Sequence, residues 1–163
     1  MKRALIAAML LVAAALSSPS FAGEAEDIAT SFCVTRMKSD AEAVKPMLTQ
    51  SLLAVIKDAE ERNDIIAKGN PEEKPPLGDG VPYQSFQDVP DTCEPGQPVE
   101  KAGLTEVPVK YTFKDSPDAG WTDTLILARD GGKLLINDVR YQGSADGSAL
   151  VGLREVLNGA FDQ

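Results

Sequence analysis

The fold is decided by WTDTLILARDGGKLLINDVRY, residues 121–141 of a 163-residue chain. Apolar and polar residues alternate before Asp130-Gly131-Gly132, and the strand expected after this tight-turn signal has apolar residues on both faces, as in Leu134-Leu135-Ile136. The residues 105–114 alternate in the same way and place four apolar side chains on one face: Val107, Val109, Tyr111 and Phe113. The second half of the chain is therefore expected to form an antiparallel meander.

Ahead of the meander, apolar residues recur at three- and four-residue steps, which predicts helices. The first spans Glu24–Lys38, with acidic residues in its first turn and basic residues in its last, as the helix dipole prefers. A short helix is expected after a cap at Asp40. A longer one is expected after a cap at Thr49 or Ser51, and it ends near residue 68.

The connections and the ends of the chain complete the fold class. Proline and glycine are too dense between residues 70 and 82 for regular structure, so this segment is either a binding loop or a plain surface connection. Strands are expected at 83–89 and 99–101, a turn-rich stretch at 90–98 and a terminal helix at 148–158. Helices followed by a meander predict an α+β domain with the helices on one face of the sheet.

The first 22 residues have the pattern of an export signal. Lys2 and Arg3 precede an uncharged apolar run, and small residues occupy positions 20 and 22. The run is shorter than the roughly 20 residues of a membrane span. We expect residues 1–22 to be a signal peptide and 23–163 to be one domain, located in the periplasm or secreted and free of the membrane after cleavage.

The charge and the absence of histidine exclude several classes of function. The chain has 16 basic and 25 acidic residues. Without Lys2 and Arg3 the balance is 14 to 25, a net charge of −11. Such a surface repels nucleic acid and anionic lipid. With no histidine in the chain, histidine-dependent triads and histidine-ligated zinc are excluded. We expect no metal and no cofactor.

Cys33 and Cys93 are the only cysteines. In an oxidising compartment two cysteines most often pair, so we expect a disulfide between them. Two separate buried thiols are the alternative.

The segments VPVKYTF (107–113) and 121–141 resemble the C-terminal meander of the nuclear-transport-factor-two-like superfamily, with a final Ile-x-Asp-Val-x-Tyr strand. The nearest likeness is to exported bacterial members of unknown function. The resemblance implies a curved sheet wrapped round a helix, forming a cone with an internal pocket. Some members are isomerases or dehydratases, and others bind ligands, act as immunity proteins or form dimers. The Asp–His pairs of the enzymes have no match here.

Five residues of the expected sheet are candidates for lining a pocket: Tyr111, Trp121, Asp123, Asp138 and Tyr141. An Asp enclosed by apolar groups can act as a general base, and a tyrosine can donate a hydrogen bond to a ligand. The commoner alternative is a carboxylate bonded to a turn or paired with Arg140 or Arg129. Strict alternation places Asp138 on the face of Leu134 and Ile136, close to Arg140. No catalytic residue is assigned.

These observations favour an exported, non-enzymatic binding or interaction protein whose partner is an unidentified small molecule or protein. A second copy of the chain, paired through the sheet face to form a homodimer, is a further candidate partner. One alternative is a small-molecule isomerase or lyase that uses the Asp and Tyr candidates. Another is an immunity or inhibitor protein whose acidic surface covers a basic toxin.

The leader generates the first prediction. Mass spectrometry of the exported protein should give Gly23 as the N-terminal residue, because signal peptidase accepts the small residues Ser20 and Ala22. A retained leader, or a first residue beyond about Ile28, would overturn the localisation.

Overall fold

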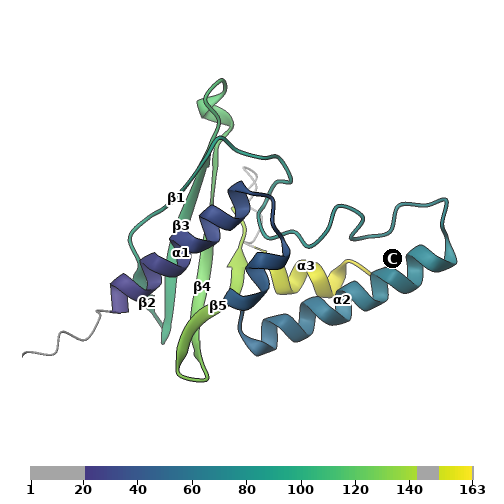
Figure 1. The fold of residues 1–163 in the computed structure, drawn as a ribbon, viewed down its shortest axis with the longest axis horizontal. Coiled ribbons are helices and arrows are strands. Elements are labelled where there is room, and N and C mark those ends of the chain that lie inside the picture. The colour runs from purple at the N-terminus through teal and green to yellow at the C-terminus, as the bar shows by residue number, and fades with distance from the viewer. Residues whose placement is uncertain (1–20, 143–150, 163) are drawn as a thin grey trace, which may run out of the picture.

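The computed structural model describes residues 21–142 and 151–162. Its elements in chain order are α1 (Phe21–Met37), η1 (Glu42–Met47), α2 (Gln50–Gly69), β1 (Thr92–Pro95), β2 (Val99–Lys101), β3 (Leu104–Thr112), η2 (Pro117–Ala119), β4 (Trp121–Asp130), β5 (Lys133–Arg140) and α3 (Leu153–Gly159). Figure 1 shows α1 lying across the sheet, while α2 extends beyond it with α3 alongside. The α+β class and the order of helices before strands are as expected. Within the described ranges, no helix is long and apolar enough to cross a membrane.

The sheet is antiparallel, with the strand order β1-β3-β4-β5. Strand β2 also pairs with β3, so β1 and β2 form two parts of one edge. Asp130 pairs with Lys133 across Gly131 and Gly132, whose φ angles are 57° and 83°. Glycine adopts these positive φ values without strain, which is why the Asp-Gly-Gly sequence makes the tight turn expected there.

Helix α1 is fastened to the sheet near both of its ends. At its start, Glu24 accepts hydrogen bonds from Arg129 Nη2 at 2.8 Å and from Leu134 N at 3.2 Å. These bonds, that from Arg129 foremost, lower the pKa of Glu24. Toward its end, the expected disulfide joins Cys33 to Cys93 of β1, with 5.3 Å between the Cα atoms. The last turn of α1 is therefore held close to the edge of the sheet.

Of the caps expected for the next two helices, the one at Thr49 is confirmed and the one at Asp40 is not. Asp40 Oδ1 accepts a hydrogen bond from Ala43 N at 3.0 Å, but the N-cap of η1 is Ala41, and no side chain caps this helix. Of the two alternatives for α2, Thr49 is the cap, and its side chain accepts from Leu52 N. Thr49 N also donates to Ile136 O at 2.9 Å, so the start of α2 is attached to β5.

Three boundaries differ from the sequence analysis. Residues 83–89 form no strand, because the buried Gln84 side chain donates to the carbonyls of Phe86 and Asp88 and curls the segment round its amide. The expected turn at 90–98 contains β1 instead. The last helix begins at Leu153, because Val151 and Gly152 pair with the end of β5. Residues 148–150 of the expected helix, and most of the expected leader, lie outside the described residues.

Strand β5 contains one extra residue. Ile126 of β4 pairs with Asp138, and the next residue of β4, Leu127, pairs with Ile136, so Asn137 has no opposite partner. The buried positions change phase at this bulge: Leu134 and Ile136 are buried before it and Val139 after it. Because side chains alternate along a strand, one inserted residue moves all later side chains to the other face.

The disulfide generates a stability prediction. Reduction should lower the free energy of unfolding by about 4 kcal/mol, because the 60-residue separation leaves a long loop unconstrained in the unfolded chain. That loss corresponds to a fall in melting temperature of roughly 10 °C. Calorimetry with and without a reductant measures it. The Cys33→Ala, Cys93→Ala double variant is the control and should melt near the reduced protein. An unchanged melting temperature on reduction would contradict the expectation.

Candidate functional site

The Asp123 carboxylate is the most enclosed charged group in the described part of the chain, with only 1% of the residue exposed. Its Oδ2 accepts from Ser85 N at 2.9 Å and from Trp121 Nε1 at 3.1 Å. Its Oδ1 accepts from Ser85 Oγ and from Gln142 N, the latter at 3.0 Å. The carboxylate therefore joins the loop before β1 to the start of β4 and to the residue that follows Tyr141. It is a carboxylate bonded to a turn, with both oxygens occupied by protein donors.

The aromatic candidates pack beside this carboxylate as part of the core. The Trp121 ring stacks on Tyr111 at 4.7 Å between centroids, and Phe86 meets its edge at 5.2 Å. Burial raises the pKa of Tyr111 well above its ordinary value, and raises that of Tyr83 to about 12. Both phenols stay protonated at neutral pH, and their buried hydroxyls have no hydrogen-bond partner in the described part of the chain.

Tyr141 has a bonding role. Its hydroxyl donates to the carbonyl of Pro82, and burial raises its pKa. Tyr141 and Asp123 thus both hold the segment that runs from Pro82 to Ser85 against the sheet. The structure brings Tyr111, Trp121 and Asp123 together, with Tyr141 close by.

Asp138 lies elsewhere, and two expectations about it were wrong. The bulge at Asn137 puts it on the opposite face from Leu134 and Ile136, where it lines an open hollow of about 380 Å³. Arg140 does not pair with it, because Arg140 Nη1 donates to Glu106 Oε1 across the sheet at 3.1 Å. Asp138 Oδ1 instead accepts from Arg154 N at 3.2 Å, in the first turn of α3. Its carboxylate fastens the C-terminal helix to β5.

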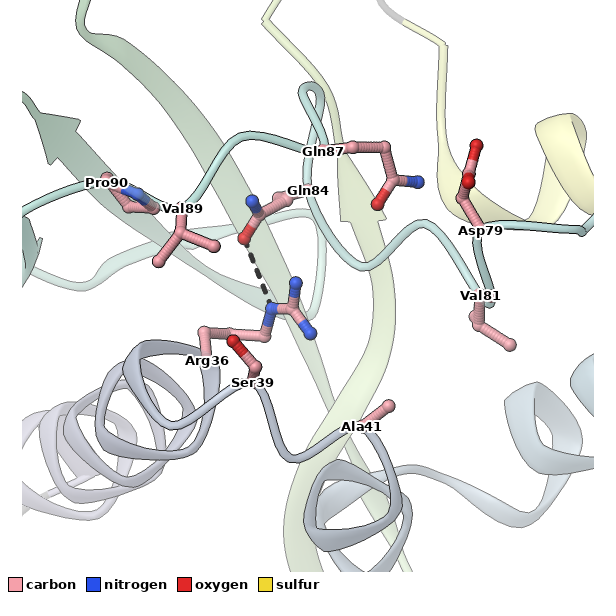
Figure 2. A pocket seen from close by; sticks show the side chains of 10 residues that line it. Arg36, Ser39, Ala41, Asp79, Val81, Gln84, Gln87, Val89 and Pro90 are labelled. Atoms are coloured by element: carbon pink, nitrogen blue, oxygen red, sulfur yellow. Dashed lines mark hydrogen bonds between the residues drawn. The ribbon is translucent and has the colours of Figure 1, made fainter.

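A second cavity, which sequence reasoning missed, lies between the end of α1 and the loop before β1. It has a volume of about 190 Å³. Figure 2 shows Arg36 reaching into it from α1. The remaining lining residues are Ser39, Ala41, Asp79, Gly80, Val81, Gln84, Gln87, Val89 and Pro90.

A buried amide holds Arg36 in position. Gln84 is 3% exposed, and its Nε2 donates to Phe86 O at 2.7 Å and to Asp88 O at 2.9 Å. These two bonds fix which end of the amide is oxygen, and that oxygen accepts from Arg36 Nε at 3.2 Å (Figure 2). The guanidinium carbon lies 5.8 Å from the centre of the Tyr83 ring. Arg36 is therefore restrained from two sides.

The terminal nitrogens of Arg36 have no acceptor among the described residues, and no carboxylate lies within 4 Å of them. Arg154 also lacks a carboxylate, but all three of its side-chain nitrogens donate to protein atoms. Burial lowers the pKa of Arg36, which records the cost of removing this cation from water without a counter-charge. In the sequence, Arg36 is indistinguishable from any basic residue that closes a helix.

No group of three or more potential metal-ligating side chains is found in the described part of the chain. The chain is 25% identical over 134 residues to the uncharacterized lipoprotein YbjP of Escherichia coli (strain K12). The alignment covers 79% of this chain and 72% of the relative. No protein-family model and no solved structure matches the chain.

The two carboxylates generate a paired prediction. In Asp123→Asn, the amide NH₂ must face at least one N–H donor in either orientation, because both oxygens accept from nitrogen. The substitution should lower the free energy of unfolding by about 3 kcal/mol. In Asp138→Asn, the amide oxygen can keep the bonds at Oδ1, so the cost should be about 1 kcal/mol or less.

Urea unfolding followed by the fluorescence of Trp121, the single tryptophan, measures both variants. Equal losses of stability would contradict this account of Asp123.

Proposed function

We propose that this protein works outside the cytoplasm as a non-enzymatic binding protein, and that its ligand carries a small anionic group bound by Arg36. The observation that carries the proposal is the restrained guanidinium whose two terminal nitrogens face a cavity without a protein acceptor. Among the other arginines in the described part of the chain, three pair with a carboxylate, and Arg154 donates hydrogen bonds from all three of its side-chain nitrogens. A ligand anion supplies the missing partner.

The chemistry favours a planar oxyanion such as a carboxylate. A guanidinium presents parallel N–H groups that match the two oxygens of a carboxylate, and charge-assisted bonds of this kind are short and strong. Gln84 holds Nε, so the guanidinium loses little conformational freedom when a ligand binds. The small cavity and its single cation correspond to an affinity in the millimolar range for a simple carboxylate.

Binding is favoured over acid–base chemistry by the state of the candidate carboxylates. A general base needs an oxygen that faces the substrate, whereas both oxygens of Asp123 already accept from protein donors. Asp138 is on the other face of the sheet and bonds the start of α3. The isomerase or lyase alternative would have to release one of these carboxylates from its structural role.

Export is part of the proposal. The leader pattern and the Cys33–Cys93 bond support it, since disulfides persist in oxidising compartments. The similarity to a protein described as a lipoprotein agrees with an extracytoplasmic place, in the periplasm or outside the cell.

We also propose membership of the nuclear-transport-factor-two-like superfamily. The helices that precede an antiparallel β3-β4-β5 meander support it.

The proposal predicts that sodium propionate binds at Arg36 with millimolar affinity. Titration followed by the NMR signal of the Arg36 Nε–H group should give a saturable shift, because this N–H belongs to the group that binds. Arg36→Gln should abolish the binding seen by calorimetry, and Arg36→Lys should weaken it because an ammonium cannot offer the paired N–H groups.

Lys38→Gln is the matched control. It removes the same charge from the segment that follows α1, but Lys38 is exposed and does not line the cavity. If Lys38→Gln reduced binding as much as Arg36→Gln, the loss of affinity would come from the loss of one positive charge. The assignment of the binding site to Arg36 would then be wrong. Trp121 fluorescence verifies that each variant is folded.

A further inference from the structure

We propose that the ligand of the Arg36 cavity is a small zwitterion of the amino-acid type, with its carboxylate on Arg36 and its ammonium at Asp79. This inference rests on the proposed function, because it assigns the second half of a ligand whose first half is the anion at Arg36. Arg36 and Asp79 line the same cavity from different segments. Figure 2 shows Arg36 near the middle of the lining residues, with Asp79 and Gln87 on the same side of it.

Asp79 is available to a ligand at small cost. Its present partner is Lys74, whose Nζ lies 2.5 Å from Asp79 Oδ2. Both side chains are mostly exposed, at 64% for Lys74 and 61% for Asp79. Exposed ion pairs contribute little stability, since water screens them and ordering two flexible side chains opposes them. An ammonium bound in the cavity therefore competes with Lys74 on nearly equal terms.

The charge of the whole chain separates a zwitterion from a bare anion. The formal net charge is −9, and Asp79 itself adds a negative charge at the cavity. A simple anion approaching Arg36 is repelled by this field, whereas a zwitterion has no net charge and can orient its two ends to match Arg36 and Asp79. The same field that weakens carboxylate binding thus favours a ligand with an added ammonium.

The dimensions and walls of the cavity limit the ligand to a small molecule. Its volume of about 190 Å³ is below the roughly 300–1,000 Å³ of pockets that hold drug-sized ligands. The lining also includes the apolar residues Ala41, Val81, Val89 and Pro90. A short aliphatic side chain fits such a wall, and a long peptide does not.

The test compares three probes of nearly the same size at low salt: propionate, alanine and ethylamine. Alanine is propionate with an added ammonium, so the difference between the two measures the second contact. Calorimetry and the Arg36 Nε–H signal should show alanine binding about fivefold more tightly than propionate, the upper range for an exposed charge pair. Ethylamine, which has no carboxylate, should leave the Arg36 signal unchanged.

Two variants address Asp79 directly. Asp79→Asn should reduce the affinity for alanine to that for propionate, and should leave propionate binding equal or stronger because a negative charge is gone. Lys74→Gln should tighten alanine binding, because it removes the competing ammonium. Asp118→Asn is the control of equal charge change, at an exposed position in the turn between β3 and β4 that does not line the cavity.

The outcomes separate the two proposals. If neither propionate nor alanine shifts the Arg36 signal, the proposed function fails and this inference fails with it. If both bind equally and Asp79→Asn changes neither affinity, Arg36 binds anions and the assignment of Asp79 is wrong. If Asp118→Asn lowered the affinity for alanine as much as Asp79→Asn, the assignment of Asp79 would also be wrong. The fall would then reflect only the net charge of the whole chain.

Discussion

The structure depends on one buried carboxylate. Asp123 accepts hydrogen bonds from two residues distant in sequence, Ser85 and Gln142, and from its strand neighbour Trp121. A buried carboxylate is tolerated only where donors replace its lost hydration, so these segments must assemble together. The Pro82–Pro90 loop is thereby fixed against β4, and Gln84 within it is held where its amide meets Arg36. The cavity is a consequence of how the core satisfies Asp123.

Local sequence patterns correctly predicted those features of the fold that depend only on neighbouring residues. The Asp-Gly-Gly turn, the Thr49 cap and the alternation of β3 each depend on a few adjacent residues, and the structure has all three. The disulfide followed from the number of cysteines and the export pattern alone.

The predictions that were wrong share one physical cause. In each case, interactions with residues distant in the sequence override the local pattern. The segment 83–89 has a strand-like composition, but the Gln84 side chain takes backbone carbonyls that a strand would have paired. The single extra residue at Asn137 is invisible to an alternation rule, and it decides which face carries Asp138. Arg36 was missed because the absence of a carboxylate beside it exists only in three dimensions. Sequence patterns find such a residue only when its partners are near it in the chain.

The position of the disulfide connects the oxidation state of the two cysteines with the Arg36 cavity. Cys33 lies one turn before Arg36, and Cys93 lies three residues after Pro90, so the bond joins the two walls of the cavity. Before oxidation, only non-covalent contacts oppose the separation of these walls. The oxidation state of the two cysteines therefore determines how firmly the two walls of the cavity are held together.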